Sequence, residues 1–325
     1  MVRIVFFLCV LASFVSEINA QAKATLSAQI YGYQQDMVYF DCVQSPTIRQ
    51  EFYTNPGEEH IYTFETDGLV CMLINGRNRF LLQPGDSLHV DIHYEGKNIK
   101  NIDFSGTDEA VNSNRQFYNI EMLKRDMRYK SQLLGCVALD VKPKDRIQDS
   151  RILLQRVKDM LDAQADKLSK SAYDYMVSDV ESAVYMSFIE YPVMYASVRH
   201  LPIEQQEIGE YGKIMDGCQV RNDEAALLNP SYIGFLMRYC FYEKEKKAKE
   251  QGVSYQVPVR FENMYNELAL FYTDEKQRDA ILYNLICNFI RAGKEIERVD
   301  PILKDYKEKY NKNPQFVQIL DNLLQ

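Results

Sequence analysis

The chain has 325 residues, with 46 acidic side chains against 38 basic ones and a formal net charge of −8. An acidic chain without a basic tract is a poor ligand for nucleic acid or anionic lipid, because affinity for phosphate depends on clustered Lys and Arg. An apolar fraction of 46% excludes general disorder, and the length suffices for two domains with cores of their own. We therefore expect a folded, two-part protein that does not bind nucleic acid.

Residues 1–20 have the composition of a secretory signal peptide. Met1-Val2-Arg3 is a short basic start, an apolar run covers residues 4–15, and a polar stretch ends in Ala20. Cleavage near Ala20 would leave a periplasmic or secreted protein with no integral membrane span. The apolar run is shorter than the roughly 20 residues that a helix needs to cross a bilayer. A retained anchor and lipid attachment at Cys9 are the alternatives for this segment.

Residues 21–106 predict an antiparallel β-sandwich domain. Apolar and polar residues alternate there with a period of two, which is typical of strands with one buried face. Turn-forming residues separate the alternating runs. Asn75-Gly76 predicts a tight hairpin, because both residue types tolerate positive φ angles. About seven or eight short strands at this spacing favour two packed sheets.

Residues 107–325 predict an irregular all-α domain, which makes the fold class α+β. Thr107, followed by Asp108 and Glu109, is typical of a helix N-terminus. A long apolar stripe with helical spacing reaches Pro192, where the helix is expected to end or bend. A capping residue before a proline predicts three further helix starts, at Asn229-Pro230, Asp300-Pro301 and Asn313-Pro314.

One strand carries the only candidate metal ligands that the sequence suggests. Strand alternation puts His89, Asp91 and His93 on the same face. The Cα atoms of the two histidines are about 13 Å apart, too far to share an ion. A site would need His89, Asp91 and a third ligand from a neighbouring strand, such as His60. We favour the alternative, a solvated outer face of the sheet, and predict no metal.

No catalytic or cofactor-binding residues are predicted. The sequence has no G-x-S-x-G, no G-x-G-x-x-G and no phosphate loop. Six widely spaced cysteines remain after the leader, without C-x-x-C, and their spacing selects no disulfide pattern. Their apolar neighbours favour small buried side chains over reactive thiols. The six are Cys42, Cys71, Cys136, Cys218, Cys240 and Cys287.

Tyrosines are abundant, with 23 in the chain. Several of them follow one predicted helix, where a tyrosine stripe is either the edge of a core or the lining of a groove for a peptide or sugar. These residues are Tyr173, Tyr175, Tyr185, Tyr191 and Tyr195.

Four short segments resemble the thioredoxin-like envelope proteins of the TlpA/AhpC-TSA type from Gram-negative anaerobes. Residues 80–90, with Pro84-Gly85-Asp86 at a turn, and residues 102–107 are similar to the N-terminal β-domain of that family. Residues 228–232 and 278–282 are similar to its helical connector. The resemblance implies a β-domain followed by helices, and in those relatives a thioredoxin domain with a Trp-Cys-x-x-Cys centre comes next.

This chain lacks the redox residues of those relatives. It contains no C-x-x-C and no tryptophan, and it ends at Gln325, about where that domain would begin. A dithiol centre needs an attacking thiolate and a resolving thiol beside it, so we expect that redox catalysis is not shared.

The leading hypothesis is a non-catalytic, exported accessory module of the cell envelope. It would bind an envelope protein, peptide or glycan, and a separate thioredoxin-like protein is one candidate partner. The alternative is a thiol-dependent or hydrolytic envelope enzyme whose site the sequence does not reveal. A structural envelope protein without a soluble ligand is a third hypothesis.

Overall fold

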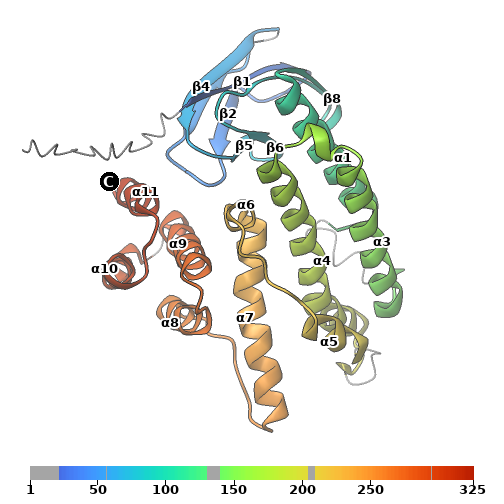
Figure 1. Ribbon diagram of the computed structural model, residues 1–325, viewed down its shortest axis with the longest axis vertical. Helices are drawn as coiled ribbons and strands as arrows, with labels where there is room; N and C mark the ends of the chain where they lie inside the picture. Colours follow the sequence, from blue (N-terminus) through green and yellow to red (C-terminus); the bar gives the residue numbers. More distant parts are fainter. Residues whose placement is uncertain (1–21, 56, 130–139, 204–208, 294) are drawn as a thin grey trace, which may run out of the picture.

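The computed structural model describes residues 22–55, 57–129, 140–203, 209–293 and 295–325 (Figure 1). Strands fill the part of the chain up to residue 106, and helices follow from residue 108. The predicted α+β class, with a β-rich part before a helical part, is confirmed. The signal peptide predicted for residues 1–20 lies outside the described residues, as does Cys136.

The strands form two four-stranded sheets, ordered β4-β1-β7-β8 and β3-β2-β5-β6. Their bounds are β1 (Ala22–Tyr31), β2 (Met37–Cys42), β3 (Arg49–Tyr53), β4 (Glu59–Thr66), β5 (Val70–Ile74), β6 (Asn78–Leu82), β7 (Ser87–Glu95) and β8 (Asn98–Gly106). β1 runs parallel to β7, with Ala28 opposite Val90, whereas the other pairs are antiparallel. The predicted antiparallel β-sandwich is found, and this one parallel pair departs from it, because alternation along a strand shows which face is buried but not the direction of its neighbour.

The two sheets share one apolar core. Leu26, Phe40 and Val90, from both sheets, are fully buried in it. β5 and β6 are joined at Asn75 and Gly76, whose φ angles are 55° and 65°. The hairpin predicted from this dipeptide is therefore confirmed, since the tight turn needs positive φ at both positions.

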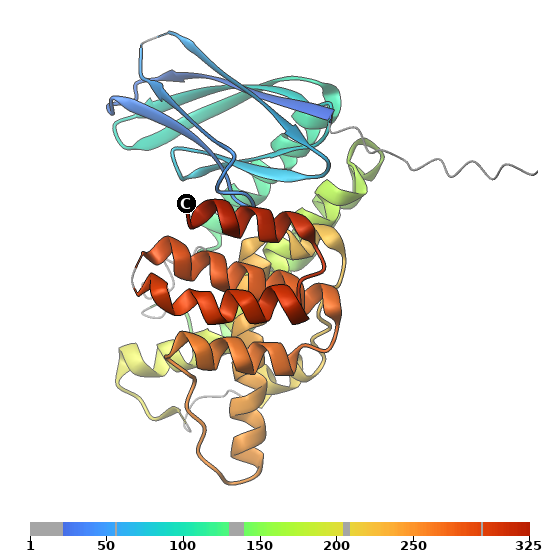
Figure 2. The same ribbon diagram turned by 90° about the vertical axis from the view of Figure 1, so that its left-hand side faces the viewer.

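The helical part mixes long helices with short ones, and its longest helix, α4, has 30 residues (Figure 2). The α-helices are α1 (Asp108–Asp126), α3 (Pro143–Asp162), α4 (Lys170–Arg199), α5 (Gly209–Asp216), α6 (Glu224–Leu227), α7 (Pro230–Glu250), α8 (Phe261–Phe271), α9 (Glu275–Ala292), α10 (Val299–Lys309) and α11 (Pro314–Leu323). The 3₁₀ turns η2 (Ala165–Lys167) and η4 (Ile296–Arg298) also belong to the described part of the chain. α4 continues through Pro192, so of the two alternatives expected at this proline, an end or a bend, the end is wrong.

Two of the three predicted Asn/Asp-Pro helix starts are confirmed. Asn229 and Asn313 cap α7 and α11 by accepting the N–H of the residue two positions later, at 3.0 Å in each case. The third prediction is wrong, because η4 runs directly into α10 and Asp300-Pro301 falls inside the first turn. A proline is tolerated there, since the first four N–H groups of a helix have no acceptor within it. Thr107 precedes α1 as predicted, although its side chain makes no capping hydrogen bond to the helix.

The sandwich packs against one end of the helices (Figures 1 and 2). Leu69, Cys71 and Leu81 turn away from the sandwich core and are buried in the helical core instead. The C-terminal α11 lies directly beneath the sandwich (Figure 2). None of the helices in the described part of the chain is long and apolar enough to cross a membrane.

Candidate functional site

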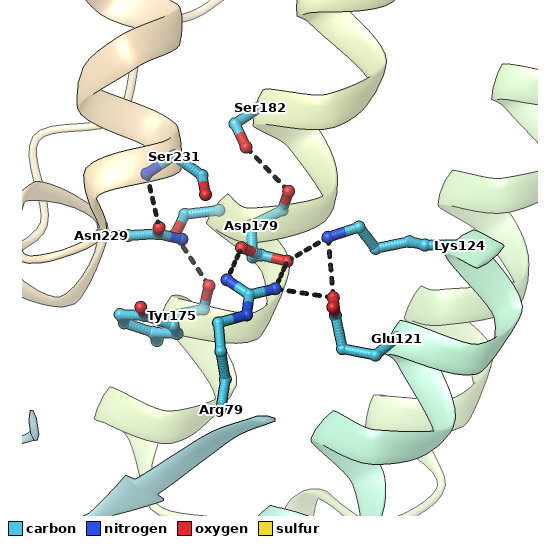
Figure 3. Close-up of polar contacts among 9 residues, drawn as sticks. Arg79, Glu121, Lys124, Tyr175, Asp179, Ser182, Asn229 and Ser231 are labelled. Atoms are coloured by element: carbon cyan, nitrogen blue, oxygen red, sulfur yellow. Dashed lines mark hydrogen bonds and ion pairs between the residues drawn. The ribbon is translucent and has the colours of Figure 1, made fainter. Parts of the chain in front are cut away.

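The interface between sandwich and helices is closed on one side by a buried ion cluster (Figure 3). Arg79 extends from β6 and donates to both carboxylate oxygens of Asp179 on α4, at 2.7 and 3.0 Å. Lys124 on α1 donates to the same carboxylate at 2.6 Å. Both cations also contact Glu121, at 2.6 and 2.8 Å. Four charges of balanced sign thus join a strand to two helices.

Burial makes this cluster sensitive to the loss of any member. The side chain of Asp179 is fully buried, and that of Arg79 is 18% exposed. Burial alone would raise the pKa of Asp179, but Arg79 and Lys124 outweigh it and hold the pKa far below its usual range. The pKa of Glu121 is lowered in the same way, by Lys124 and Arg79 against its burial. The carboxylates are therefore charged at neutral pH, and each is paired with cations. Such a buried ion-pair cluster fixes the contact between the sandwich and the helices.

The surroundings of the cluster are closed as well. Phe117 packs edge-on against Tyr175, and the guanidinium of Arg79 lies 4.7 Å from the centre of the Phe117 ring. The amide of Asn229, at the start of α7, donates to Ser178 on α4 at 3.1 Å (Figure 3). These contacts leave little reason to expect a ligand here, and we assign the cluster a structural role.

The opposite side of the interface is an open groove of about 800 Å³. Its sandwich wall consists of the β2–β3 and β4–β5 connections, and its helical wall consists of α6, α11 and the residues before α11. The groove lies within the 300–1,000 Å³ range, roughly, that is typical of small-ligand sites. It is the candidate functional site.

The lining of the groove is mostly polar and carries negative charge. Amides, hydroxyls and the carboxylates of Glu65, Asp67 and Glu224 face it, and no Lys or Arg belongs to the described lining. The apolar contribution includes Phe316, whose ring stacks on Tyr283 with centroids 4.0 Å apart. Such a surface favours neutral or cationic ligands and disfavours phosphates and other anions.

Gln44 belongs to the lining of the groove, and its side-chain amide is held by the backbone of β5. Its side-chain oxygen accepts the backbone N–H of Cys71 at 2.9 Å, which fixes the orientation of the amide. Its side-chain nitrogen is buried and donates to no group in the described part of the chain. A buried donor without an acceptor is unfavourable by about 1–3 kcal/mol.

Two hydrogen bonds link the walls of the groove. The hydroxyl of Tyr283 on α9 donates to the carbonyl of Gln44 at 2.9 Å, across 239 positions of the sequence. The amide of Gln315 donates to Asp67 at 2.6 Å on the exposed rim. They hold the loops of the sandwich against α9 and α11 and leave the space between them open.

The structure keeps His89 close to Asp91 and places His60 inside the sandwich, away from both. His89 contacts Ser27 at 2.7 Å and Glu59 at 2.9 Å through Nδ1, while its Nε2 lies 3.5 Å from Asp91. The two carboxylates lie at opposite nitrogens of the ring, so one ion could not bind both together with His89. His60 is buried and packs against Phe52 inside the sandwich. Neighbouring positions of β4 point to opposite faces, and this overturns His60 as a third ligand.

Nothing else in the described segments replaces that site. Among these residues, no group of three or more His, Cys, Asp or Glu side chains could hold a metal ion. His93 is stacked on Tyr31, with ring centroids 4.5 Å apart. The histidine strand therefore forms part of a polar outer face of the first sheet.

The cysteines with described positions are free thiols in protective surroundings. They are Cys42, Cys71, Cys218, Cys240 and Cys287. Burial raises the pKa of Cys42 to about 11 and those of Cys71, Cys218 and Cys240 to about 12. A thiol with such a pKa is protonated at neutral pH and is a poor nucleophile.

The tyrosine stripe of α4 belongs to the core and not to the groove. Tyr175 and Tyr191 are fully buried, and Tyr185 stacks on Phe235 at 5.4 Å. None of them lines the groove. The residues that do line it were not identified from the sequence. The one available signal was Asn313-Pro314, which places the start of α11 beside the groove.

Comparison with models of known families, with curated proteins and with solved structures gave no match.

Proposed function

We propose that this chain is a non-catalytic, exported binding module of the cell envelope, and that its ligand occupies the interface groove. The observation that carries the proposal is the groove itself, about 800 Å³ in volume and lined by amides, hydroxyls and carboxylates. The signal-peptide-like start of the sequence supports an envelope location.

The chemistry of the lining favours a protein segment, a peptide or a glycan as the ligand. Amides of Gln44, Asn313, Gln315, Gln318 and Asn322 line the groove beside several hydroxyls. Amides and hydroxyls both donate and accept, so they suit the carbonyl, N–H and hydroxyl groups of these ligands. The aromatic face of Phe316 adds an apolar contact of the kind that peptides and sugars use. The family resemblance adds a separate thioredoxin-like protein as a candidate partner.

The buried thiols argue against a thiol-dependent enzyme. Alkylation at neutral pH, followed by peptide mapping, would test this point. We expect the five described cysteines to react far more slowly in the folded protein than after unfolding. A rapidly alkylated cysteine among them would favour the enzymatic alternative.

Capture from an envelope extract tests the binding proposal. The immobilised full chain would be compared with Gln318→Trp, which fills the groove from α11, and with Gln155→Trp as a matched control. Gln155 is an exposed glutamine on α3, as Gln318 is on α11, but it lies outside the groove.

We expect the wild type and Gln155→Trp to retain the same protein or glycan, and Gln318→Trp to lose it. Equal capture by all three proteins would contradict binding in the groove. If the wild type retains no specific protein or glycan, the proposal that the chain is a binding module is wrong.

A further inference from the structure

The sandwich has four strand edges, and three of them are protected. The β6 edge is covered by α1, where Asn114 accepts the N–H of Leu81 at 2.8 Å and donates to its carbonyl at 2.7 Å. β3 has only five residues, with Arg49 paired to Asp41 and Glu51. Short length, covering elements and charged pairs are common ways of preventing an edge from pairing with another chain.

The edge formed by β8 is protected in another way. A shift in the β7–β8 register between His93 and Tyr94 interrupts the regular ladder, and Lys100 stands on the strand itself. Irregular ladders and lysines both discourage the addition of a further strand.

β4 is the exception. It has eight residues, pairs with β1 without a register shift and contains no Lys, Arg or Pro. Its composition, with Ile61, Tyr62, Thr63 and Phe64 in a row, is typical of a strand. Within the described residues, its backbone forms hydrogen bonds only with β1. Figure 1 shows β4 at the outer edge of the sandwich.

The edge of β4 is acidic and leads into the groove. Glu58 and Glu59 lie at its start, and Glu65 and Asp67 lie at its end. Glu59 lies 2.9 Å from Nδ1 of His89, and Lys23 is opposite Glu65 in the pairing register. Glu65 and Thr66, at the end of β4, also line the groove. An extended chain paired with β4 would therefore pass directly from the strand edge to the groove.

We infer that the free edge of β4 accepts a basic, extended peptide segment as an added strand, and that this segment continues into the interface groove. The inference rests on the proposed binding function and names its ligand class. Main-chain hydrogen bonds to β4 would supply affinity, and the acids along its edge would select Lys or Arg in the partner.

The probe is a fluorescein-labelled octapeptide of alternating Lys and Val, titrated with the full chain and followed by fluorescence anisotropy. Two N-methylated forms carry methyl groups on the odd or on the even residues. In a strand only alternate N–H groups point to one neighbour. One methylated form should therefore bind about tenfold or more weakly, while the other binds nearly as well as the parent. A peptide with Glu in place of Lys should not bind.

Matched variants of the protein test whether the acids at the β4 edge select a basic peptide. Glu65→Gln with Asp67→Asn removes two acids at the β4 edge, and Asp103→Asn removes an exposed acid from β8 on the other edge of the same sheet. We expect the double variant to bind the Lys-Val peptide at least about fivefold more weakly at low salt, and Asp103→Asn to bind it normally.

Equal binding of both methylated peptides would overturn pairing with β4. An unchanged affinity of the double variant would overturn the selection for basic residues. If the groove captures a glycan or a folded protein from the extract but the wild type ignores the Lys-Val peptide, this inference fails and the proposed function stands.

Discussion

The interface between sandwich and helices has a closed half and an open half, and the two differ in how they use polar groups. In the closed half, Arg79, Lys124, Asp179 and Glu121 satisfy one another and are largely withdrawn from water. In the open half, amides, hydroxyls and carboxylates line a groove of about 800 Å³. The first arrangement fixes the two parts relative to each other, and the second leaves hydrogen-bonding capacity for a ligand.

The largest expected effect is on the closed half. Asp179→Asn removes the charge that pairs with both Arg79 and Lys124, and leaves two buried cations with Glu121 alone. Breaking a buried ion pair in this way lowers stability by about 3–5 kcal/mol. Urea denaturation followed by circular dichroism would measure it. Asp67→Asn, at the exposed rim of the groove, is the matched control and should change stability by less than about 0.5 kcal/mol. Equal effects of the two variants would remove the distinction between the halves.

The next effect is the dependence of stability on pH. The folded-state pKa of Asp179 lies below the value of about 3.9 for an unfolded Asp. Its contribution to stability is therefore complete well above that pH, from about pH 5, and is lost as the pH falls towards the folded-state pKa. We expect the free energy of unfolding to decline on acidification below about pH 5, and less steeply in Asp179→Asn. Parallel curves for the two proteins would contradict a charged carboxylate in this cluster.

A smaller effect is expected where the walls of the open half are joined. Tyr283→Phe removes the hydrogen bond to the carbonyl of Gln44 and keeps the stacked ring against Phe316. The loss should be about 0.5–1.5 kcal/mol, as for a single neutral hydrogen bond. Thermal unfolding would measure it. A loss as large as that of Asp179→Asn would mean that the open half is as important for docking the sandwich as the closed half.

The smallest effect on stability is expected for Gln318→Trp, at less than about 0.5 kcal/mol, because the side chain is exposed on α11. Gln318→Trp should nevertheless abolish ligand capture. A strongly destabilised Gln318→Trp protein would show that α11 depends on this position for packing, and a smaller groove substitution, Gln318→Leu, would then replace it in the capture experiment.

The sequence was sufficient for features set by local physics. Alternation identified the strands, and Asn75-Gly76, Asn229 and Asn313 marked a turn and two helix starts, because each acts through its own backbone geometry. The strand directions were not predictable in the same way, since β1 and β7 are separated by some 60 positions and their parallel pairing depends on the whole topology. The helix start predicted at Asp300-Pro301 was wrong for a related reason, because the preceding 3₁₀ turn runs directly into α10 and the helix begins earlier.

The candidate site was not predictable, because it is assembled from distant segments. Gln44 and Tyr283 meet across 239 positions, and Asp67 and Gln315 across 248. Each is an ordinary polar residue whose neighbours in sequence carry no catalytic or ligand motif. The buried partners of Asp179 were hidden for the same reason, since 46 acids make any single one inconspicuous in the sequence.

Hydrogen–deuterium exchange of the full chain, with and without the ligand captured from the envelope extract, tests the central claim most directly. Slowed exchange reports which backbone amides the ligand covers or stabilises. We expect new protection along β4, in the β4–β5 connection and at the start of α11, with no change around Asp179. Protection confined to other surfaces, or none at all with saturating ligand, would contradict a binding function for the open half of the interface.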